Sequence, residues 1–251
     1  MLIGTAVYSV DIAVSGAIIN TSERTSSDLF VGVYQHFADY FMMSADFSYN
    51  PVTHYSLRSS FGFENRFLLA GAGLFFGFHN GIAQPGFCFD LGARIPEILS
   101  FKGWGNLAVN PAQMGDLTSF SGNGLLSISV SNVIVSLVFL YQMQDSLVDS
   151  PVSRRTQIDG GFDYEVFSQE LPIGFVLSMG IRHFTYLFDD SSSGQKMRVM
   201  AGLKLLWGDR KGLNGFVGLQ AFPMTLYQTG SSERIPDANF ALNAGLRCSF
   251  D

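Results

Sequence analysis

Residues 41–50 read FMMSADFSYN and residues 54–63 read HYSLRSSFGF, and these two stretches decide the fold. In both, apolar and polar side chains alternate with a period of two, which is the pattern of a β-strand with unlike faces. The segment Pro51–Thr53 between them contains a proline and predicts a turn. The stretch therefore predicts a β-hairpin with one apolar face and one polar face.

The same alternation recurs along nearly the whole chain of 251 residues. It predicts an all-β protein with a single domain spanning residues 1–251 and about fourteen antiparallel strands, twelve or sixteen being the alternatives. We expect the strands at residues 5–18, 28–37, 41–50, 54–63, 67–78, 86–95, 99–109, 124–131, 133–143, 156–166, 173–186, 196–207, 213–227 and 238–250.

The distribution of charge separates this pattern from that of a soluble β-sandwich. Charged residues make up 14% of the chain, against about 25% in an average soluble domain. In the segments whose register can be assigned, none of them falls on the apolar face, and the polar faces are rich in Ser, Asn and Gly. A charge facing lipid near the bilayer centre costs about 2–4 kcal/mol, so a lipid-facing surface explains the pattern. We therefore expect a closed, up-and-down transmembrane β-barrel and keep a soluble β-protein as the alternative.

Composition also excludes other classes of protein. A chain this apolar, with a mean hydropathy of +0.22, is not disordered. Its longest apolar stretches, such as Val133–Tyr141, are too short for a membrane-spanning helix. A net charge of −6 without a basic stripe argues against nucleic-acid binding.

The connections between the expected strands alternate in length. One set is tight, as at Ser131-Asn132, and most of the other set is longer and polar, as at Asn110–Asn123 and Gln144–Arg155. Short periplasmic turns and long outer loops are typical of outer-membrane barrels, and an even number of strands returns both termini to the periplasmic side. Aromatic residues gather near both expected rims, which indicates two interfacial belts.

Over its whole length the chain resembles bacterial outer-membrane β-barrel proteins. Its end, residues 243–250, is similar to their C-terminal recognition strand through Asn243, Gly245 and Phe250, although Cys248 replaces an aromatic residue and Asp251 follows. The resemblance implies a place in the outer membrane of a Gram-negative-type envelope, contact with its lipid, and insertion by the barrel assembly machinery. It also implies a signal peptide, which we expect to have been removed from this chain.

Two groups of outer-membrane barrels have a similar size or number of strands. One is the OmpG-type porins, and the other is the FadL-like transporters of hydrophobic compounds. The FadL-like proteins carry an Asn-Pro-Ala signature before their first strand, whereas here Asn110-Pro111-Ala112 lies in the middle of the chain.

The polar faces of the strands predict the side chains that line the lumen. The candidate lumen and selectivity residues are Asp11, Asp46, Arg58, Asp90, Arg94, Lys102, Asp159, Asp163, Glu165, Arg182, Arg198, Lys204 and Arg247, with Lys196 on the same face. Folding the hairpin about Pro51–Thr53 places Asp46 opposite Arg58 as a cross-strand ion pair. The remaining acids and bases either oppose one another across a constriction and select solutes, or form structural pairs along a polar wall.

A second group of inward side chains is apolar. Ile134, Val138 and Leu140 on one strand, with Val176 and Phe184 on another, form a possible apolar lumen patch for a hydrophobic solute or a folded-in loop.

These patterns favour an outer-membrane channel for passive diffusion of small solutes through a polar lumen. The alternatives are a FadL-like conduit for hydrophobic compounds, or a plugged barrel acting in surface interaction or secretion. Neither the solute nor the oligomeric state follows from the pattern.

Catalysis and cofactors have no support in the sequence. The four histidines are scattered, and no catalytic elbow, zinc helix or Cys-x-x-Cys motif occurs. We therefore expect no enzyme activity, no cofactor and no metal. Cys88 and Cys248 are expected on opposite faces of different strands, without a disulfide.

Overall fold

The chain folds as fourteen antiparallel strands that close on themselves. The computed structural model describes residues 9–21, 25–37, 40–50, 54–79, 82–109, 117–144, 152–167, 172–208, 212–235 and 238–250. The strands are β1 (Ser9–Thr21), β2 (Thr25–Phe37), β3 (Phe41–Asn50), β4 (His54–Glu64), β5 (Leu68–His79), β6 (Ile82–Ile95), β7 (Leu99–Val109), β8 (Leu117–Val130), β9 (Val133–Gln144), β10 (Val152–Phe167), β11 (Ile173–Phe188), β12 (Ser193–Gly208), β13 (Leu213–Gly230) and β14 (Ala238–Phe250). A short 3-10 helix, η1 (Ser232–Arg234), lies between β13 and β14.

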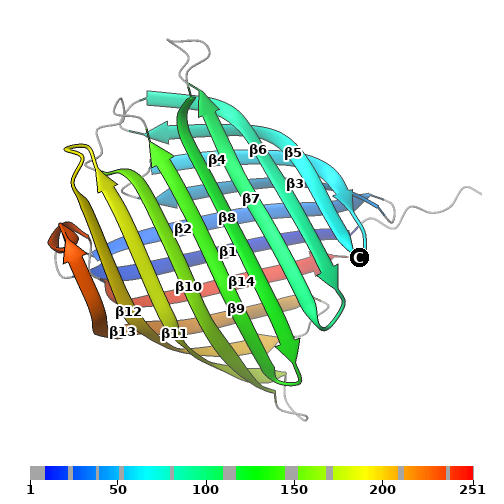
Figure 1. The fold of residues 1–251 in the computed structure, drawn as a ribbon. Helices are drawn as coiled ribbons and strands as arrows, with labels where there is room; N and C mark the ends of the chain where they lie inside the picture. Colours follow the sequence, from blue (N-terminus) through cyan, green and yellow to red (C-terminus); the bar gives the residue numbers. More distant parts are fainter. Residues whose placement is uncertain are drawn as a thin grey trace, which may run out of the picture.

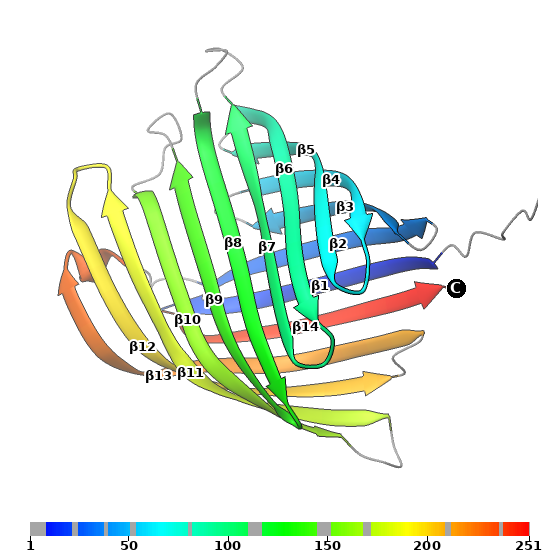
Figure 2. The same ribbon diagram turned by 45° about the vertical axis from the view of Figure 1, so that its right-hand side comes forward.

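Each strand pairs with its neighbours in sequence, and β1 pairs with β14 to close the barrel. The closing register runs from Val10 opposite Phe250 to Thr21 opposite Ala238. The start of β1 and the end of β14 therefore lie at the same end of the barrel, as Figure 1 shows at the label C. The strands of the two walls cross in Figures 1 and 2, which is the tilt that closure requires.

The strand alternation predicted from the sequence sorts the side chains into an outward and an inward face. Large apolar side chains are exposed on the outward face around the whole barrel, for example Leu74 at 67%, Phe87 at 61% and Val135 at 51%. A surface so apolar is suited to lipid and not to water. Within the described residues, no helix is long and apolar enough to cross a membrane.

Aromatic side chains pack together near both rims of the outward face. Near the short turns, Tyr40 stacks on Phe63 with a ring-centroid distance of 5.9 Å, and Phe41 stacks on Phe61 at the same distance. At the other rim the rings of Tyr55 and Tyr49 are 5.4 Å apart. The prediction of an aromatic belt does not hold at Tyr186, which faces inward and is 7% exposed.

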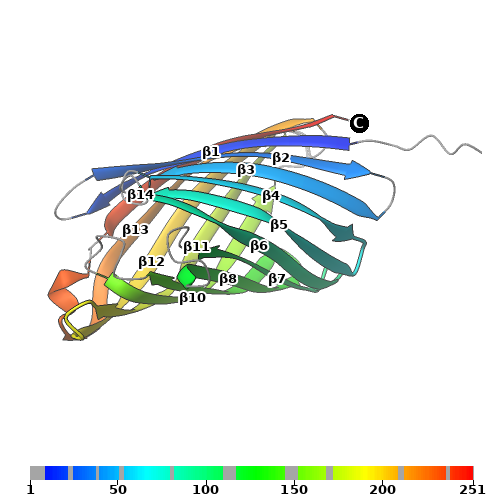
Figure 3. The same ribbon diagram turned by 90° about the horizontal axis from the view of Figure 1, so that it is seen from above.

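The number of strands and their order agree with the sequence prediction, but the difference in loop length is smaller than predicted. Strand β1 continues to Thr21 and β2 begins at Thr25, so most of the expected loop Asn20–Ser27 is paired strand. Likewise, β5 continues to His79 and β6 begins at Ile82. Backbone pairing continues here although the apolar alternation has stopped, because side chains beyond the lipid need not be apolar. In Figure 3 strands β1 to β4 lie side by side, seen from above.

Candidate functional site in the barrel interior

The inward face carries all thirteen charged residues that the sequence places in the lumen. On each strand they occupy the positions that alternate with the exposed apolar side chains, as Asp11 does beside Ile12 and Glu165 beside Tyr164. Their proposed role in selectivity stays a prediction. Two cavities along this face define the candidate site.

The larger cavity has a volume of about 680 Å³ and lies against the wall formed by β2 to β8. It extends from Asp46 and Trp104 in mid-strand to Asn65 and Phe67 in the turn after β4. Its charged lining consists of three acids and three bases, Asp46, Glu64, Asp90, Arg58, Arg94 and Lys102. The cavity therefore has no net formal charge.

The ion pair predicted between Asp46 and Arg58 is not formed, although the two residues are opposite one another in the register. The Arg58 guanidinium instead lies 2.9 Å from the Asp90 carboxylate and donates to the backbone carbonyl of Phe89 at 2.8 Å. The physical reason lies on the strand between them, where Gly71 and Gly73 carry no side chain that would obstruct Arg58.

Arg94 and Lys102 lie toward the short-turn end of the cavity. The Arg94 guanidinium donates to the carbonyls of Asn65 and Arg66 and lies 3.5 Å from Glu64, so it ties β6 to the turn after β4. The Lys102 ammonium lies 5.9 Å from the centre of the Trp104 ring, within the range of a cation–π contact.

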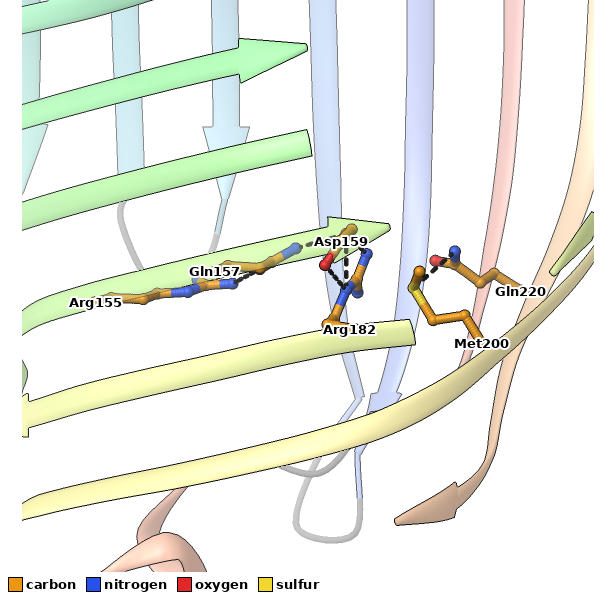
Figure 4. Close-up of polar contacts among 6 residues, drawn as sticks. All are labelled: Arg155, Gln157, Asp159, Arg182, Met200 and Gln220. Carbon is orange, nitrogen blue, oxygen red and sulfur yellow. Dashed lines mark hydrogen bonds and ion pairs between the residues drawn. The ribbon is translucent and has the colours of Figure 1, made fainter. Parts of the chain in front are cut away.

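The smaller cavity, of about 430 Å³, lies against β9 to β14. Its centre is the ion pair in which Arg182 Nη2 approaches Asp159 Oδ2 at 2.7 Å, while Nε donates to both carboxylate oxygens. Gln157 donates to Asp159 at 2.9 Å and accepts from Arg155 at 2.7 Å (Figure 4). Across the same cavity the Gln220 amide contacts the Met200 sulfur at 3.7 Å.

Arginine and aromatic side chains alternate on this wall near the end of the barrel where η1 lies. The Arg182 guanidinium lies 4.9 Å from the Phe222 ring centre and 5.8 Å from that of Phe184. Arg155 lies 5.7 Å from the Phe184 ring centre, and Arg198 lies 5.5 Å from that of Phe222. Arg198 is 7% exposed and donates to the carbonyl of Phe222. These cations are packed into the wall and hold it together.

An apolar cluster lies at the η1 end of this wall. Phe184, Tyr186 and Phe188 of β11 pack against Ile235, which follows η1 and is 2% exposed. The connection between β13 and β14 therefore folds over the ends of β11 and β12.

The predicted acidic stripe and basic patch lie on neighbouring strands of one wall. Asp159, Asp163 and Glu165 share the inward face of β10, but the register puts Arg182 beside Asp159 and then Arg198 beside Arg182, on adjacent strands of one wall. Lys204 lies nearer the short turns, in register with Val176. The acids on β10 and the bases on β11 and β12 therefore lie side by side, one or two strands apart as the sequence predicts, and their role in selectivity stays a prediction.

The predicted apolar lumen residues face inward but do not form one patch. Val138 and Leu140 on β9 are separated from Phe184 on β11 by Asp159 and Gln157 on β10. Ile134 and Val176 are separated in the same way by Asp163 and Glu165. The loop Asn110–Asn123 was proposed as their occupant, but from Leu117 onwards this segment is strand β8. Its residues 110–116 lie outside the described part of the chain.

The three residues of the predicted assembly signal lie in β14. Asn243 lines the smaller cavity, Gly245 pairs with Ser15, and Phe250 is 53% exposed. A Cβ at Gly245 would lie 2.6 Å from the Phe216 ring, so a side chain here would have to displace that ring. Their recognition by an assembly machinery stays a prediction.

Three inward aromatic residues of the larger cavity, Phe30, Tyr34 and Trp104, were not among the predicted lumen residues. Trp104 follows Lys102 by two positions on β7 and therefore shares its face, which is a signal that the sequence contains. Cys88 is buried inside and Cys248 lies in β14; both are free thiols. Among the described residues, no group of three His, Cys, Asp or Glu side chains is arranged to hold a metal ion.

A scan of protein-family models finds no match, and no curated protein matches the sequence. Among solved structures, the chain is similar to a bacterial polysaccharide outer membrane secretin, with 10% identity, a TM-score of 0.60, and coverage of 96% of this chain and 98% of that chain. OmpT, an outer membrane protein of Vibrio cholerae, has 9% identity and a TM-score of 0.48, covering 98% of this chain and 97% of its own. The KdgM porin has 9% identity and a TM-score of 0.44, covering 96% of this chain and 99% of its own. The first similarity establishes the fold, which is that of a bacterial outer-membrane β-barrel.

Proposed function

We propose that this chain is a channel of the bacterial outer membrane through which small polar solutes diffuse passively. The observation that carries the proposal is the charged inward face with its two cavities of about 680 and 430 Å³. The exposed apolar outward face supports a place in lipid, and the same fold occurs in an outer-membrane protein.

The geometry favours this function over a conduit for hydrophobic compounds. The inward apolar side chains of β9 and β11 are separated by the acids of β10, and a hydrophobic solute would have to pass beside those charges. A polar solute exchanges hydrogen bonds with water for hydrogen bonds with the wall, and this exchange costs little.

The test is conductance in a planar lipid bilayer combined with thiol labelling. In a background with Cys88→Ala and Cys248→Ser, we expect Lys102→Cys to form channels whose current falls when a charged, water-soluble thiosulfonate is added. The matched control is Leu57→Cys, because Leu57 lies on the outward face and is 52% exposed there. We expect its current to stay unchanged.

The result that would refute the proposal is the absence of conductance from protein that is demonstrably folded by β-rich circular dichroism and heat-modifiable gel migration. That result would favour a plugged barrel, with the apolar cluster around Ile235 as part of the obstruction.

A further inference from the structure

We propose that the larger cavity binds an uncharged carbohydrate, so that the channel selects oligosaccharides of two or three units. This inference rests on the proposed channel function and names its class of solute. It starts from the volume of about 680 Å³, which lies within the range of about 300–1,000 Å³ for small-molecule sites.

The aromatic side chains of the cavity are the first line of support. Trp104 and Tyr34 project from β7 and β2 into a cavity whose lining is mixed, with polar side chains beside apolar ones such as Phe30, Met42 and Leu125. The exposure of an aromatic ring to the water of a channel is unfavourable, and the ring is stabilised when an apolar surface covers it. The C–H face of a pyranose ring is such a surface, and its hydroxyl groups remain free around the edge.

The polar groups beside these rings are the second line of support. Asp46, Lys102 and the indole N–H of Trp104 have no hydrogen-bond or ion-pair partner among the described residues. The Asn106 side-chain oxygen and Arg58 Nε are buried without a hydrogen-bond partner in that part of the chain. Buried polar atoms are normally satisfied, so these atoms indicate a ligand or water that supplies donors and acceptors together. A hydroxyl group supplies both.

The balance of charge selects among polar ligands. The three acids and three bases of the lining cancel, so the cavity attracts neither anions nor cations strongly. Among polar solutes, an uncharged polyol pays the smallest desolvation free energy when it enters a cavity lined by charges of both signs. Asp46 and Lys102 provide an acceptor and a donor for neighbouring hydroxyl groups.

Tryptophan fluorescence tests the site directly, because the chain has two tryptophans. The second, Trp207, lies on β12 opposite Ile173 and does not line the cavity. In the variant Trp207→Phe, refolded in detergent, Trp104 is the remaining reporter. We expect at least one of maltotriose, cellotriose and mannotriose to change its emission with saturation in the millimolar range. The same sugar should reduce the bilayer current with the same half-saturating concentration.

Two variants locate the site. Trp104→Ala should raise the half-saturating concentration for current block by about two- to tenfold, the effect of one lost aromatic contact, while Trp104→Phe should retain most of the affinity. In the reciprocal control, Trp207 fluorescence in the Trp104→Phe variant should not respond to sugar. Each variant is checked for heat-modifiable migration before use.

The outcomes separate this inference from the channel proposal. A conducting channel that responds to none of the three sugars, or responds only to trigalacturonate, overturns the carbohydrate site and leaves the channel. Saturable sugar binding without conductance overturns the channel and leaves the site. Sugar binding that Trp104→Ala does not weaken overturns the assigned location.

Discussion

Arg58 joins two strands that are not neighbours, because it leaves β4, passes over β5 and reaches Asp90 on β6. Both side chains of the pair are largely buried, with 12% and 9% exposure. Removing one partner leaves a charge without compensation. We expect Asp90→Ala to lower the free energy of unfolding by about 1–3 kcal/mol, the range for a lost hydrogen bond to a charged group in a partly hydrated site. Urea unfolding in lipid vesicles measures it.

A double-mutant cycle distinguishes the two possible partners of Arg58. The coupling energy between Arg58→Ala and Asp90→Ala should be about 1 kcal/mol or more, and that between Arg58→Ala and Asp46→Ala should be close to zero. Asp46 is the matched control because it lies opposite Arg58 in the register. A larger coupling to Asp46 than to Asp90 would contradict this assignment.

The Arg58 case shows what the sequence can and cannot predict about the site. Counting residues from Pro51–Thr53 predicts the register correctly, since the side-chain period of a hairpin is fixed. The partner depends on how far a long side chain reaches over Gly71 and Gly73, and that depends on a neighbouring strand that the hairpin does not contain. The inward position of a lumen charge was therefore predictable, and its partner was not.

The turn between β8 and β9 consists of Ser131 and Asn132, and Ser131 has a φ of 55°. A positive φ at the first of two turn residues is typical of a II′ turn, where glycine is preferred. We expect Ser131→Gly to stabilise the barrel by about 0.5–1 kcal/mol, because glycine removes the strain at some cost in unfolded-state entropy. The control is Asn132→Gly, for which no gain is expected. Equal unfolding midpoints for Ser131→Gly and the parent protein would contradict it.

The turn after β11 is joined to η1 by Asp190. Its carboxylate accepts from the Ser192 hydroxyl and backbone N–H, and the Arg234 guanidinium lies 2.6 Å away. The Ser192 hydrogen bonds first, and Arg234 second, hold the pKa of Asp190 at about 2 instead of 3.8. Because the folded-state pKa is lowered, this interaction is fully present above about pH 4 and is lost as the pH falls through about 2.

Carboxyl NMR titration of the protein in micelles checks this assignment. We expect Asp190 to titrate near pH 2, Ser192→Ala to raise its pKa most, and Arg234→Ala to raise it less. An Asp190 pKa that neither substitution changes would show that the turn and η1 are not joined in this way.

Strand ends were the part of the fold that the sequence predicted least well. The alternation of apolar and polar residues marks where a strand faces lipid, and this was enough to locate all fourteen strands. Beyond the lipid, pairing continues through polar residues, as where the Asn20 amide donates to the Thr25 hydroxyl at 3.2 Å. Backbone hydrogen bonds extend these strands without any periodic pattern of side chains, so the pattern predicted loops there.

Because the barrel is closed, alternate positions along each strand face either the lumen or the outside. The position of a residue in this alternation therefore determines whether its side chain is surrounded by water or by lipid. The pairing of β1 with β14 leaves no unpaired edge, which a bilayer would not tolerate. The two faces differ in kind: apolar side chains form the outside, and charged and neutral polar groups form most of the inside. This difference is a property of the whole barrel and can be tested with one substitution made on each face.

Leu74 and Leu140 are a matched pair for this test. Leu74 is 67% exposed on the outward face of β5, whereas Leu140 faces inward on β9 between Asn123 and Gln157. In lipid vesicles we expect Leu74→Lys to cost about 2–4 kcal/mol, because the ammonium group would lie in hydrocarbon. Leu140→Lys should cost about 1 kcal/mol or less, because lumen water and two amides solvate the charge. Guanidinium unfolding of both variants measures the difference, and equal costs would mean that the outward face does not meet lipid.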